Sequence, residues 1–334
     1  SQERLYPGQV LVTSIEDRPT EKTTLLGYAF PWANERTLRG ILPYADTLVP
    51  FTYGFTEAGE LVEPDDEGLL ALAKEFGAKT LLHLSTLTEQ GSFSAQRAGA
   101  VLGDDAARGA LIQNTVRVMR EKGFAGVDVD FEYLPGYLSG AYAAFLERLR
   151  RILRPIGRFL WVALAPKTSA DQRGLLYEGH DYAALDAAVD AALLMTYEWG
   201  YTAGLPNVRA VLDYAVTELP AEKLLLGVPN YGYDWPLPFV QGQTRAKSIS
   251  NQQAIDLALQ YRIAIQYDQT AQSPYFHYTA EDGIIHEVWF EDARSLSAKL
   301  RLIAEYGFLG SGIWNLMRPF SQIWLLADSL YDIV

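Results

Sequence analysis

The chain has 334 residues, of which 49% are hydrophobic and 21% charged, and it contains no cysteine. Its formal net charge of −13 disfavours a nucleic-acid or anionic-membrane partner, because both bind cationic protein surfaces. The lack of cysteine excludes disulfides, thiolate nucleophiles and thiolate metal ligands. No apolar run is long enough to span a bilayer, so no membrane insertion is expected.

The first 22 residues are polar and precede the first predicted strand, so we expect residues 1–22 to form an N-terminal tail or linker. Eight short apolar runs follow, separated by helical patterns. Most of these runs are apolar almost throughout, as parallel strands covered on both faces are. The predicted strands are Thr23–Tyr28, Thr47–Thr56, Lys79–Ser85, Gly126–Glu132, Phe159–Ala165, Ala191–Tyr197, Lys223–Tyr231 and Gly310–Asn315.

The helical patterns between these strands include Asp104–Lys122, Ser139–Leu153 and Asn207–Glu218. Eight strands with helical connections predict an α/β fold, a (β/α)8 TIM barrel over residues 23–334. The rival architecture is an open doubly wound sheet. It is disfavoured because no glycine-rich dinucleotide loop follows the first strand.

One interval, at about 236–292, does not fit a single strand–helix unit. It contains a helical pattern at Asn251–Tyr261 and then extended runs at Ala264–Tyr267, Tyr275–Tyr278 and Ile284–Phe290. A turn signal at Glu281-Asp282-Gly283 separates the last two runs. We therefore expect a small α+β insertion before the last barrel strand, packed over the barrel mouth.

The most informative segment, Gly126–Glu132, carries three carboxylates at alternate positions. Because side chains alternate faces along a strand, Asp128, Asp130 and Glu132 point to one side, with apolar residues on the other. Neighbouring carboxylates on such a strand lie roughly 6.6 Å apart. In a closed barrel, the polar face of this strand is the interior.

Three carboxylates in a barrel interior repel one another and lose hydration, so at least one is expected to be protonated near neutral pH. A general acid needs this protonated state to donate a proton to a leaving group. The structural alternative, a solvated polar face on an edge strand, does not fit neighbouring strands that are apolar on both faces. This carboxylate ladder, formed by Asp128, Asp130 and Glu132, therefore indicates an acid–base site with Glu132 as the candidate acid.

Other candidate residues lie where predicted strands end, which is where chemistry collects in such barrels. Met195 and Tyr197 share one face of their strand, and Glu198 is predicted just beyond its end. Aromatic groups recur at this rim and suit the apolar faces of sugar rings. The remaining candidate binding residues are Tyr28, Tyr231, Asp234, Trp235 and Trp314. For each one alone, an ordinary core role is the alternative.

The four histidines, His83, His180, His277 and His286, show no two-ligand helical spacing. We expect at least three of them to be structural or exposed to solvent. No Ser–His–Asp order, nucleophile elbow or phosphate loop is present. No metal site and no cofactor is therefore predicted.

Gly126–Glu132 resembles the DxxDxDxE signature of family 18 glycoside hydrolases, the chitinase-like barrels. The last three acids match, and Ala125 replaces the first. Met195–Trp199 is similar to the family's MxYD segment, with glutamate in place of aspartate. Two further segments carry the likeness, Gly227–Trp235 and Gly310–Trp314.

Within the family, Met195–Tyr201 and Asp234-Trp235 look like the branch of bacterial spore-cortex and germination hydrolases, which are often fused to LysM domains. Leu5–Leu11 also resembles the end of a LysM module. The tail at 1–22 is therefore interpreted as a candidate remnant of such a module.

The resemblance implies a retaining mechanism without an enzymic nucleophile, in which the substrate's own 2-acetamido oxygen attacks the anomeric carbon. It implies that Glu132 protonates the glycosidic oxygen and then deprotonates the attacking water. Asp130 would bind the acetamido N–H, and Tyr197 would position the acetamido oxygen. Trp314 would form the floor under the distorted sugar, and Asp128 would share a proton or hydrogen bond with Asp130.

The partner implied is a glycan containing N-acetylglucosamine, with the peptidoglycan of the spore cortex as the leading substrate. The alternatives are a chitinase or endo-N-acetylglucosaminidase on other glycans, or a non-catalytic glycan-binding protein. The presence of Glu132 disfavours the last. A monomer acting outside the cell, at the cell wall or spore, is expected.

Overall fold

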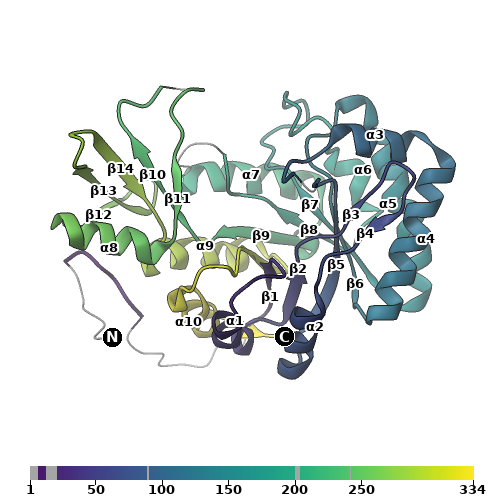
Figure 1. Cartoon of the computed structure of the whole chain (residues 1–334), viewed down its shortest axis with the longest axis horizontal. Coiled ribbons are helices and arrows are strands. Elements are labelled where there is room, and N and C mark those ends of the chain that lie inside the picture. Colours follow the sequence, from purple (N-terminus) through teal and green to yellow (C-terminus); the bar gives the residue numbers. More distant parts are fainter. Residues whose placement is uncertain (1–6, 13–20, 89, 200–203, 241) are drawn as a thin grey trace.

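A computed structural model describes residues 7–12, 21–88, 90–199, 204–240 and 242–334. Its central feature is a closed ring of parallel strands, with a smaller antiparallel unit to one side (Figure 1). Among these residues, no helix is long and apolar enough to cross a membrane.

Eight parallel strands form the ring in the order β15-β9-β8-β7-β6-β5-β2-β1, and β15 also pairs with β1 to close it. Thr24 lies opposite Gly310 at this closing seam. The predicted (β/α)8 barrel is thereby confirmed. The strands are β1 Lys22–Ala29, β2 Thr47–Pro50, β5 Lys79–Ser85, β6 Gly126–Asp130, β7 Phe159–Leu164, β8 Ala191–Leu194, β9 Leu224–Pro229 and β15 Gly310–Trp314.

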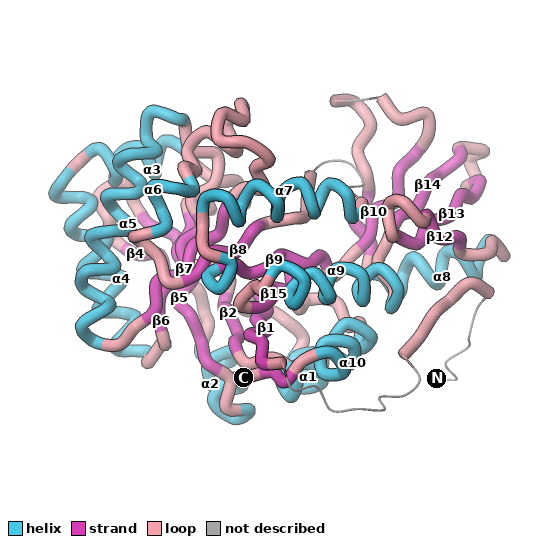
Figure 2. Tube along the Cα trace, turned by 180° about the vertical axis from the view of Figure 1, so that it is seen from behind, coloured by secondary structure: helices cyan, strands magenta, loops and turns pink. Residues whose placement is uncertain are grey.

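Helices cover the outside of this ring, and Figure 2 shows α7 and α9 lying over the strands β8 and β9. The helices are α1 Glu35–Ile41, α2 Glu67–Phe76, α3 Ala95–Gly103, α4 Asp105–Lys122, α5 Ser139–Leu153, α6 Tyr182–Asp186, α7 Leu205–Glu218, α9 Ala293–Tyr306 and α10 Ser321–Leu330. Short 3₁₀ turns occur at Leu42–Tyr44, Gly136–Leu138, Arg154–Ile156 and Ala221–Lys223.

Local capping sets the bounds of α4, one of the predicted helices. The Asp104 side chain accepts a hydrogen bond from the backbone N–H of Ala107, as an N-cap residue does. The helix ends at Gly123, whose φ of 78° is left-handed and suits glycine. Helix α5 also has its predicted bounds, Ser139–Leu153.

Six of the eight barrel strands are shorter than predicted. β2 stops at Pro50, β6 at Asp130 and β8 at Leu194, although apolar or alternating residues continue beyond each, and β7, β9 and β15 also end one or two residues early. Burial explains the pattern that continues after β2, because Tyr53 and Phe55 are fully buried in the apolar core between strands and helices. After β2 the chain forms a short antiparallel pair of strands, β3 Gly54–Phe55 and β4 Leu61–Val62.

The predicted insertion is a five-stranded antiparallel sheet in the order β11-β10-β14-β13-β12, with its own apolar core against α8. It begins at Gly232, four residues before the predicted boundary. A Cβ atom at Gly232 would lie 2.4 Å from the carbonyl oxygen of Trp289, so this close strand approach requires glycine. Its elements are β10 Gly232–Pro236, β11 Lys247–Ile249, α8 Asn251–Tyr261, β12 Gln266–Asp268, β13 Ser273–Thr279 and β14 Ile285–Trp289.

The described part of the predicted tail contacts the folded body. The Ile265 N–H donates to the carbonyl of Pro7, and the Val12 N–H donates to Gln322 Oε1 at 2.7 Å. Residues 1–6, which include Leu5 and Tyr6, and residues 13–20 lie outside the described residues. At the other terminus, a two-residue strand, β16 Asp332–Ile333, pairs with the start of β1.

Candidate active site

A cavity of about 300 Å³ opens at the C-terminal ends of the barrel strands. It is the place where a barrel of this kind gathers functional side chains from several strands. Most of the predicted site residues line it, namely Tyr28, Asp130, Glu132, Met195, Tyr197, Glu198 and Trp314.

The carboxylate ladder has the predicted orientation. The side chains of Asp128 and Asp130 are buried inside the ring, 1% and 4% exposed. Their neighbours Val127 and Val129 are fully buried in the apolar core between strands and helices. Glu132 follows the last residue of β6 and reaches the cavity. The ladder therefore rises from the barrel interior to the open mouth.

Polar contacts to the ladder come from neighbouring strands. The Tyr28 hydroxyl on β1 donates to Asp128 Oδ2 at 2.9 Å. His83 Nε2 on β5 lies 3.7 Å from Asp128 Oδ2 and 3.7 Å from Asp130 Oδ2. Among the described residues, no group donates a hydrogen bond to Asp130 Oδ1, although this oxygen is buried. A buried acceptor of this kind is suited to a donor supplied by a ligand.

Burial and mutual repulsion raise the pKa values of the ladder. Burial raises the pKa of Asp128 to about 7. The pKa of Asp130 lies well above its ordinary value because of burial first, then the charges of Glu132, Asp128 and Glu198. Burial and the charge of Glu198 raise the pKa of Glu132 to about 7. Near neutral pH the site therefore retains protons, as the sequence predicts.

Glu198 reaches the cavity through an unusual backbone turn. It has a φ of 57°, which breaks the alternation of the preceding residues. As a result, Met195, Tyr197 and Glu198 all line the same cavity. The Trp314 Nε1–H donates to Glu198 Oε1 at 2.9 Å and holds the carboxylate at the rim.

Trp314 is the centre of an aromatic wall. Its ring lies 6.4 Å from that of Tyr197, nearly parallel at 13°. It also meets Phe51 at 4.8 Å and Tyr28 at 5.8 Å, both edge to face. Because rings from strands on opposite sides of the mouth fix its position, the indole offers a firm apolar face to a ligand.

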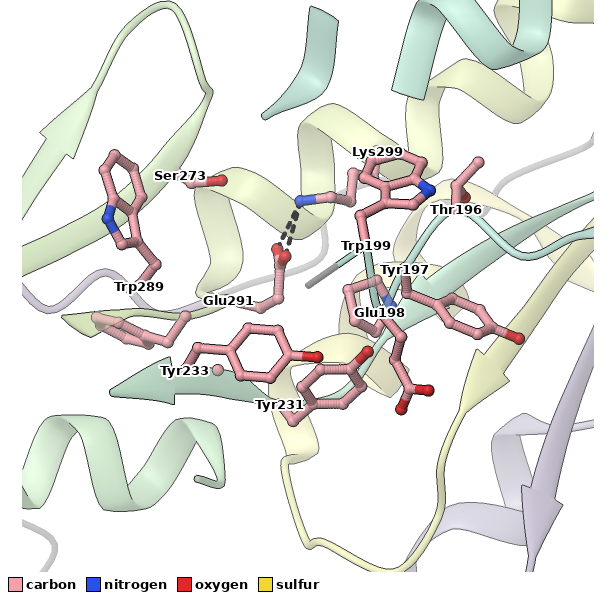
Figure 3. A pocket seen from close by; sticks show the side chains of 13 residues that line it. Thr196, Tyr197, Glu198, Trp199, Tyr231, Tyr233, Ser273, Trp289, Glu291 and Lys299 are labelled. Atoms are coloured by element: carbon pink, nitrogen blue, oxygen red, sulfur yellow. Dashed lines mark hydrogen bonds and ion pairs between the residues drawn. The ribbon is translucent and has the colours of Figure 1, made fainter. Parts of the chain in front are cut away.

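A smaller cavity of about 50 Å³ lies between the barrel mouth and the insertion (Figure 3). Tyr197 and Glu198 line both cavities, so the smaller one extends the mouth toward the insertion. Tyr231 and Tyr233 stand on its insertion side with their rings edge to face at 5.5 Å. The structure thus brings Tyr231 beside Glu198, as Figure 3 shows.

Two predicted binding residues lie elsewhere. Asp234 is buried in the insertion, where it accepts a hydrogen bond from the Tyr278 hydroxyl at 2.9 Å and lies 2.7 Å from His286 Nδ1. Trp235 is buried against the rings of Tyr233 and Phe239. Neither lines the two cavities above. Both lie on β10, where Asp234 is held by Tyr278 and His286 of the insertion sheet and Trp235 packs against Phe239.

His83 is the site residue that the sequence does not single out. It lies opposite Asp128 in the β5–β6 register and is 1% exposed. Its neighbours Leu82 and Leu84 belong to the outer core, so the alternation along β5 turns His83 toward the barrel interior. That alternation was the available signal, but only the register shows which carboxylates the ring meets.

Lys299 and Glu291 form a buried ion pair in the wall of the smaller cavity, with Nζ 2.8 Å from both carboxylate oxygens. Both side chains are almost inaccessible to solvent. We expect Lys299→Met to lower the free energy of unfolding by about 3–5 kcal/mol, because it leaves a buried carboxylate without a counter-charge. Urea unfolding measures this loss.

The double variant Glu291→Leu/Lys299→Met is the matched control, because it removes both charges together. It should recover most of the lost stability, since burying an ion pair brings little net gain. Equal destabilisation in the single and double variants would contradict the interpretation.

Comparison with known proteins identifies the architecture. The model of glycosyl hydrolases family 18 matches residues 13–318. The cortical fragment-lytic enzyme of Bacillus subtilis (strain 168) is 41% identical over 307 residues, which cover 90% of this chain and 71% of that protein. The putative sporulation-specific glycosylase YdhD of the same organism is 32% identical over 305 residues, covering 89% and 72%.

Solved structures agree. The spore cortex-lytic enzyme SleL of Bacillus megaterium QM B1551 superimposes with a TM-score of 0.89 at 37% identity, covering 99% of this chain and 79% of that one. A chitinase from Chromobacterium violaceum superimposes with a TM-score of 0.85 at 26% identity, covering 92% and 98%. The chain therefore belongs to glycoside hydrolase family 18 and is a glycosidase similar to the spore cortex-lytic enzymes.

Proposed function

We propose that this glycosidase cleaves the bond on the reducing side of N-acetylglucosamine in spore-cortex peptidoglycan, with retention and with assistance from the substrate's acetamido group. The observation that carries the proposal is Asp130 Oδ1, a buried carboxylate oxygen without a donor among the described residues, on a side chain that lines the same cavity as Glu132. The acetamido N–H of a bound sugar supplies the missing donor.

In the first step, the acetamido oxygen forms a bond to the anomeric carbon as the glycosidic bond breaks. Glu132 gives its proton to the departing oxygen, and positive charge develops on the cyclised oxazolinium ring. Asp130 stabilises that charge through the N–H. In the second step, water attacks the anomeric carbon and gives a proton to Glu132, and the ring reopens to the acetamido group. Two displacements leave the anomeric configuration unchanged.

The other site residues have supporting roles in this proposal. The Tyr197 hydroxyl donates a hydrogen bond to the acetamido oxygen, and Trp314 lies under the sugar ring. Tyr28 holds Asp128 through the 2.9 Å hydrogen bond. Met195 supplies an apolar contact, while Glu198 and Tyr231 bind sugar hydroxyls at the rim. No cofactor takes part in any of these steps.

The proposed substrate rests on the relatives. The B. subtilis cortical fragment-lytic enzyme and the B. megaterium SleL structure are named for action on the spore cortex. We infer the same class of glycan here, and a site of action outside the cell, at the spore or cell wall. The alternative is chitin, because the similar C. violaceum structure is a chitinase. Both polymers present N-acetylglucosamine.

Product analysis by mass spectrometry tests the substrate. Purified cortex peptidoglycan and chitin oligomers are digested in parallel with the wild type and with Glu132→Gln as the inactive control. We expect muropeptides with N-acetylglucosamine at the reducing end from peptidoglycan. Cleavage of chitin oligomers alone, or muropeptides with muramic acid at the reducing end, would overturn the proposal.

The pH dependence of the reaction follows from Glu132. Its pKa is raised to about 7, and a general acid works only while protonated, so kcat/KM should fall as the pH rises through about 7. Glu198→Gln removes the negative charge that helps to raise this pKa. The basic limb of the profile should then move to lower pH by roughly half a unit.

The experiment measures the pH at which the basic limb of the kcat/KM profile falls, over the range from pH 4 to pH 9. The absolute rate is not the readout, because Glu198 also binds substrate in the proposal. Glu198→Asp keeps a carboxylate at this position, and it is the comparison variant. A limb that stays in place in Glu198→Gln would exclude the proposed coupling.

A further inference from the structure

His83 lies beside Asp128 on the neighbouring strand and lines the cavity, but it has no part in the mechanism above. Its ring is packed between Tyr28, edge to face at 5.5 Å, and Phe51, at 4.7 Å. Both ring nitrogens face polar groups. Because these aromatic contacts fix the orientation of the imidazole ring, each of its nitrogens faces its own set of polar groups.

The Nδ1 side faces Thr52. Thr52 Oγ1 lies 2.6 Å from His83 Nδ1, 3.0 Å from Ser85 Oγ and 3.1 Å from the His83 carbonyl oxygen. This contact fits either tautomer, and the Thr52 hydroxyl donates to Nδ1 in the tautomer that carries the ring proton on Nε2. The opposite tautomer would leave a bare Nε2 lone pair facing two carboxyl groups, which is electrostatically unfavourable.

The Nε2 side faces the carboxylates. Nε2 is equidistant, at 3.7 Å, from Asp128 Oδ2 and Asp130 Oδ2. This is longer than a hydrogen bond, so the N–H dipole acts on both oxygens together. Burial lowers the pKa of His83 to about 3, and the ring therefore acts as a neutral donor.

The titratable groups around this ring are few. Tyr28 on β1 and the two aspartates on β6 face it directly. The charges of Glu132 and Glu198 also act on Asp130, and the buried hydroxyls of Tyr142 and Tyr197 interact electrostatically with both aspartates. The Tyr28 hydroxyl donates to Asp128 but has no such bond to Asp130 among the described residues. His83 Nε2 lies within 4 Å of one oxygen of each aspartate and so links the two carboxyl groups.

We propose that His83 is a positioning residue for this reaction: its Nε2–H interacts with Asp128 Oδ2 and Asp130 Oδ2 together, favours negative charge on the Asp128–Asp130 pair, and so fixes the orientation of the Asp130 carboxylate that meets the substrate's acetamido N–H. The inference rests on the proposed acetamido-assisted function. It adds a residue outside the signature segment that governs the charge of the pair.

Three variants separate the parts of this arrangement. His83→Phe keeps an aromatic ring but removes both nitrogens, and His83→Gln restores an N–H near the Nε2 position. Thr52→Val removes the hydroxyl that contacts His83 Nδ1. The matched control is His180→Gln. His180 is equally buried, but its nitrogens contact backbone groups of Ala165 and Phe131 and it lines neither cavity.

The first readout is the pH profile of kcat on cortex muropeptides. His83→Phe should lower kcat on the order of tenfold with KM within about twofold, because the charge that stabilises the transition state is weakened. The acidic limb of its kcat profile should move to higher pH, because the ionised Asp128–Asp130 pair loses its favourable interaction with the Nε2–H dipole. His83→Gln should move the limb back toward the wild type, and Thr52→Val should lie between the two. His180→Gln should lower the melting temperature without moving the limb.

The second readout is independent of turnover. Protein labelled with ¹³C at aspartate carboxyl carbons is titrated by NMR, and Asp128→Asn and Asp130→Asn assign the two signals. The pair should titrate at higher pH in His83→Phe than in the wild type. Unchanged titration, with an unmoved acidic limb and only a lower melting temperature, would overturn the inference. A wild type that titrates as expected but cleaves no N-acetylated glycan would refute the proposed function and leave this electrostatic role standing.

Discussion

Glu132→Gln should lower kcat by about 10³- to 10⁴-fold, which is the upper range for loss of a positioned general acid. Glutamine keeps the size and hydrogen-bonding capacity of the side chain but cannot give a proton to the glycosidic oxygen. Glu132 suits this role because its carboxyl faces the cavity and its pKa is raised to about 7, which keeps much of it protonated near neutral pH. Turnover of cortex muropeptides, followed by mass spectrometry, measures the loss.

Loss of a general acid also makes the rate depend more strongly on the leaving group of the substrate. A substrate with a good leaving group, such as a nitrophenyl glycoside of chitobiose, needs little protonation. The variant should therefore lose less activity on that substrate than on muropeptides. Its melting temperature should be close to that of the wild type, because Glu132 is partly exposed at the mouth. Near-normal hydrolysis of muropeptides by Glu132→Gln would remove the central assignment.

Asp130→Asn should lower kcat by about 10²- to 10³-fold while KM changes little, the size of effect expected when one preorganised electrostatic group is lost. Asparagine can still accept the acetamido N–H through its oxygen, but it carries no charge to stabilise the oxazolinium ring. The variant therefore isolates the charge from the hydrogen bond. Single-turnover kinetics on muropeptides separate the chemical step from binding.

Asp128→Asn is the matched control for this prediction, because Asp128 lies one step deeper on the same strand face and does not line the cavity. We expect a smaller loss of kcat from it, since it acts on the reacting sugar through Asp130. A loss in Asp128→Asn as large as that in Asp130→Asn would place the critical charge on the deeper residue. Unchanged kcat in Asp130→Asn would exclude acetamido assistance as proposed.

Much of the active site could be predicted from local sequence, for physical reasons. The two-residue alternation of a strand places Asp128, Asp130 and Glu132 on one face whatever surrounds them. The rule that barrel chemistry gathers at the C-terminal strand ends also singles out Tyr197 and Trp314. Both rules depend only on neighbouring residues and on the fold class, and the structure brings these five side chains to one barrel interior and mouth.

Contacts between distant segments could not be predicted in this way. The sequence places Asp234 and Trp235 just after a barrel strand, but that stretch pairs with β14 and buries both in the insertion. Glu198 faces the cavity only because its backbone is left-handed at that point. In each case the deciding partner lies far along the chain or in a backbone turn that residue type does not specify.

The sequence by itself determined the barrel and the carboxylate ladder, because periodicity and strand-end position are local properties of the chain. Only the tertiary structure decided the surroundings of that ladder. The β5–β6 register sets His83 against Asp128 and Asp130, and the chain after β2 brings Thr52 to the other ring nitrogen. Electrostatic environment is a sum over neighbours in space, so the charge state of the ladder emerges only once the ring of strands has closed.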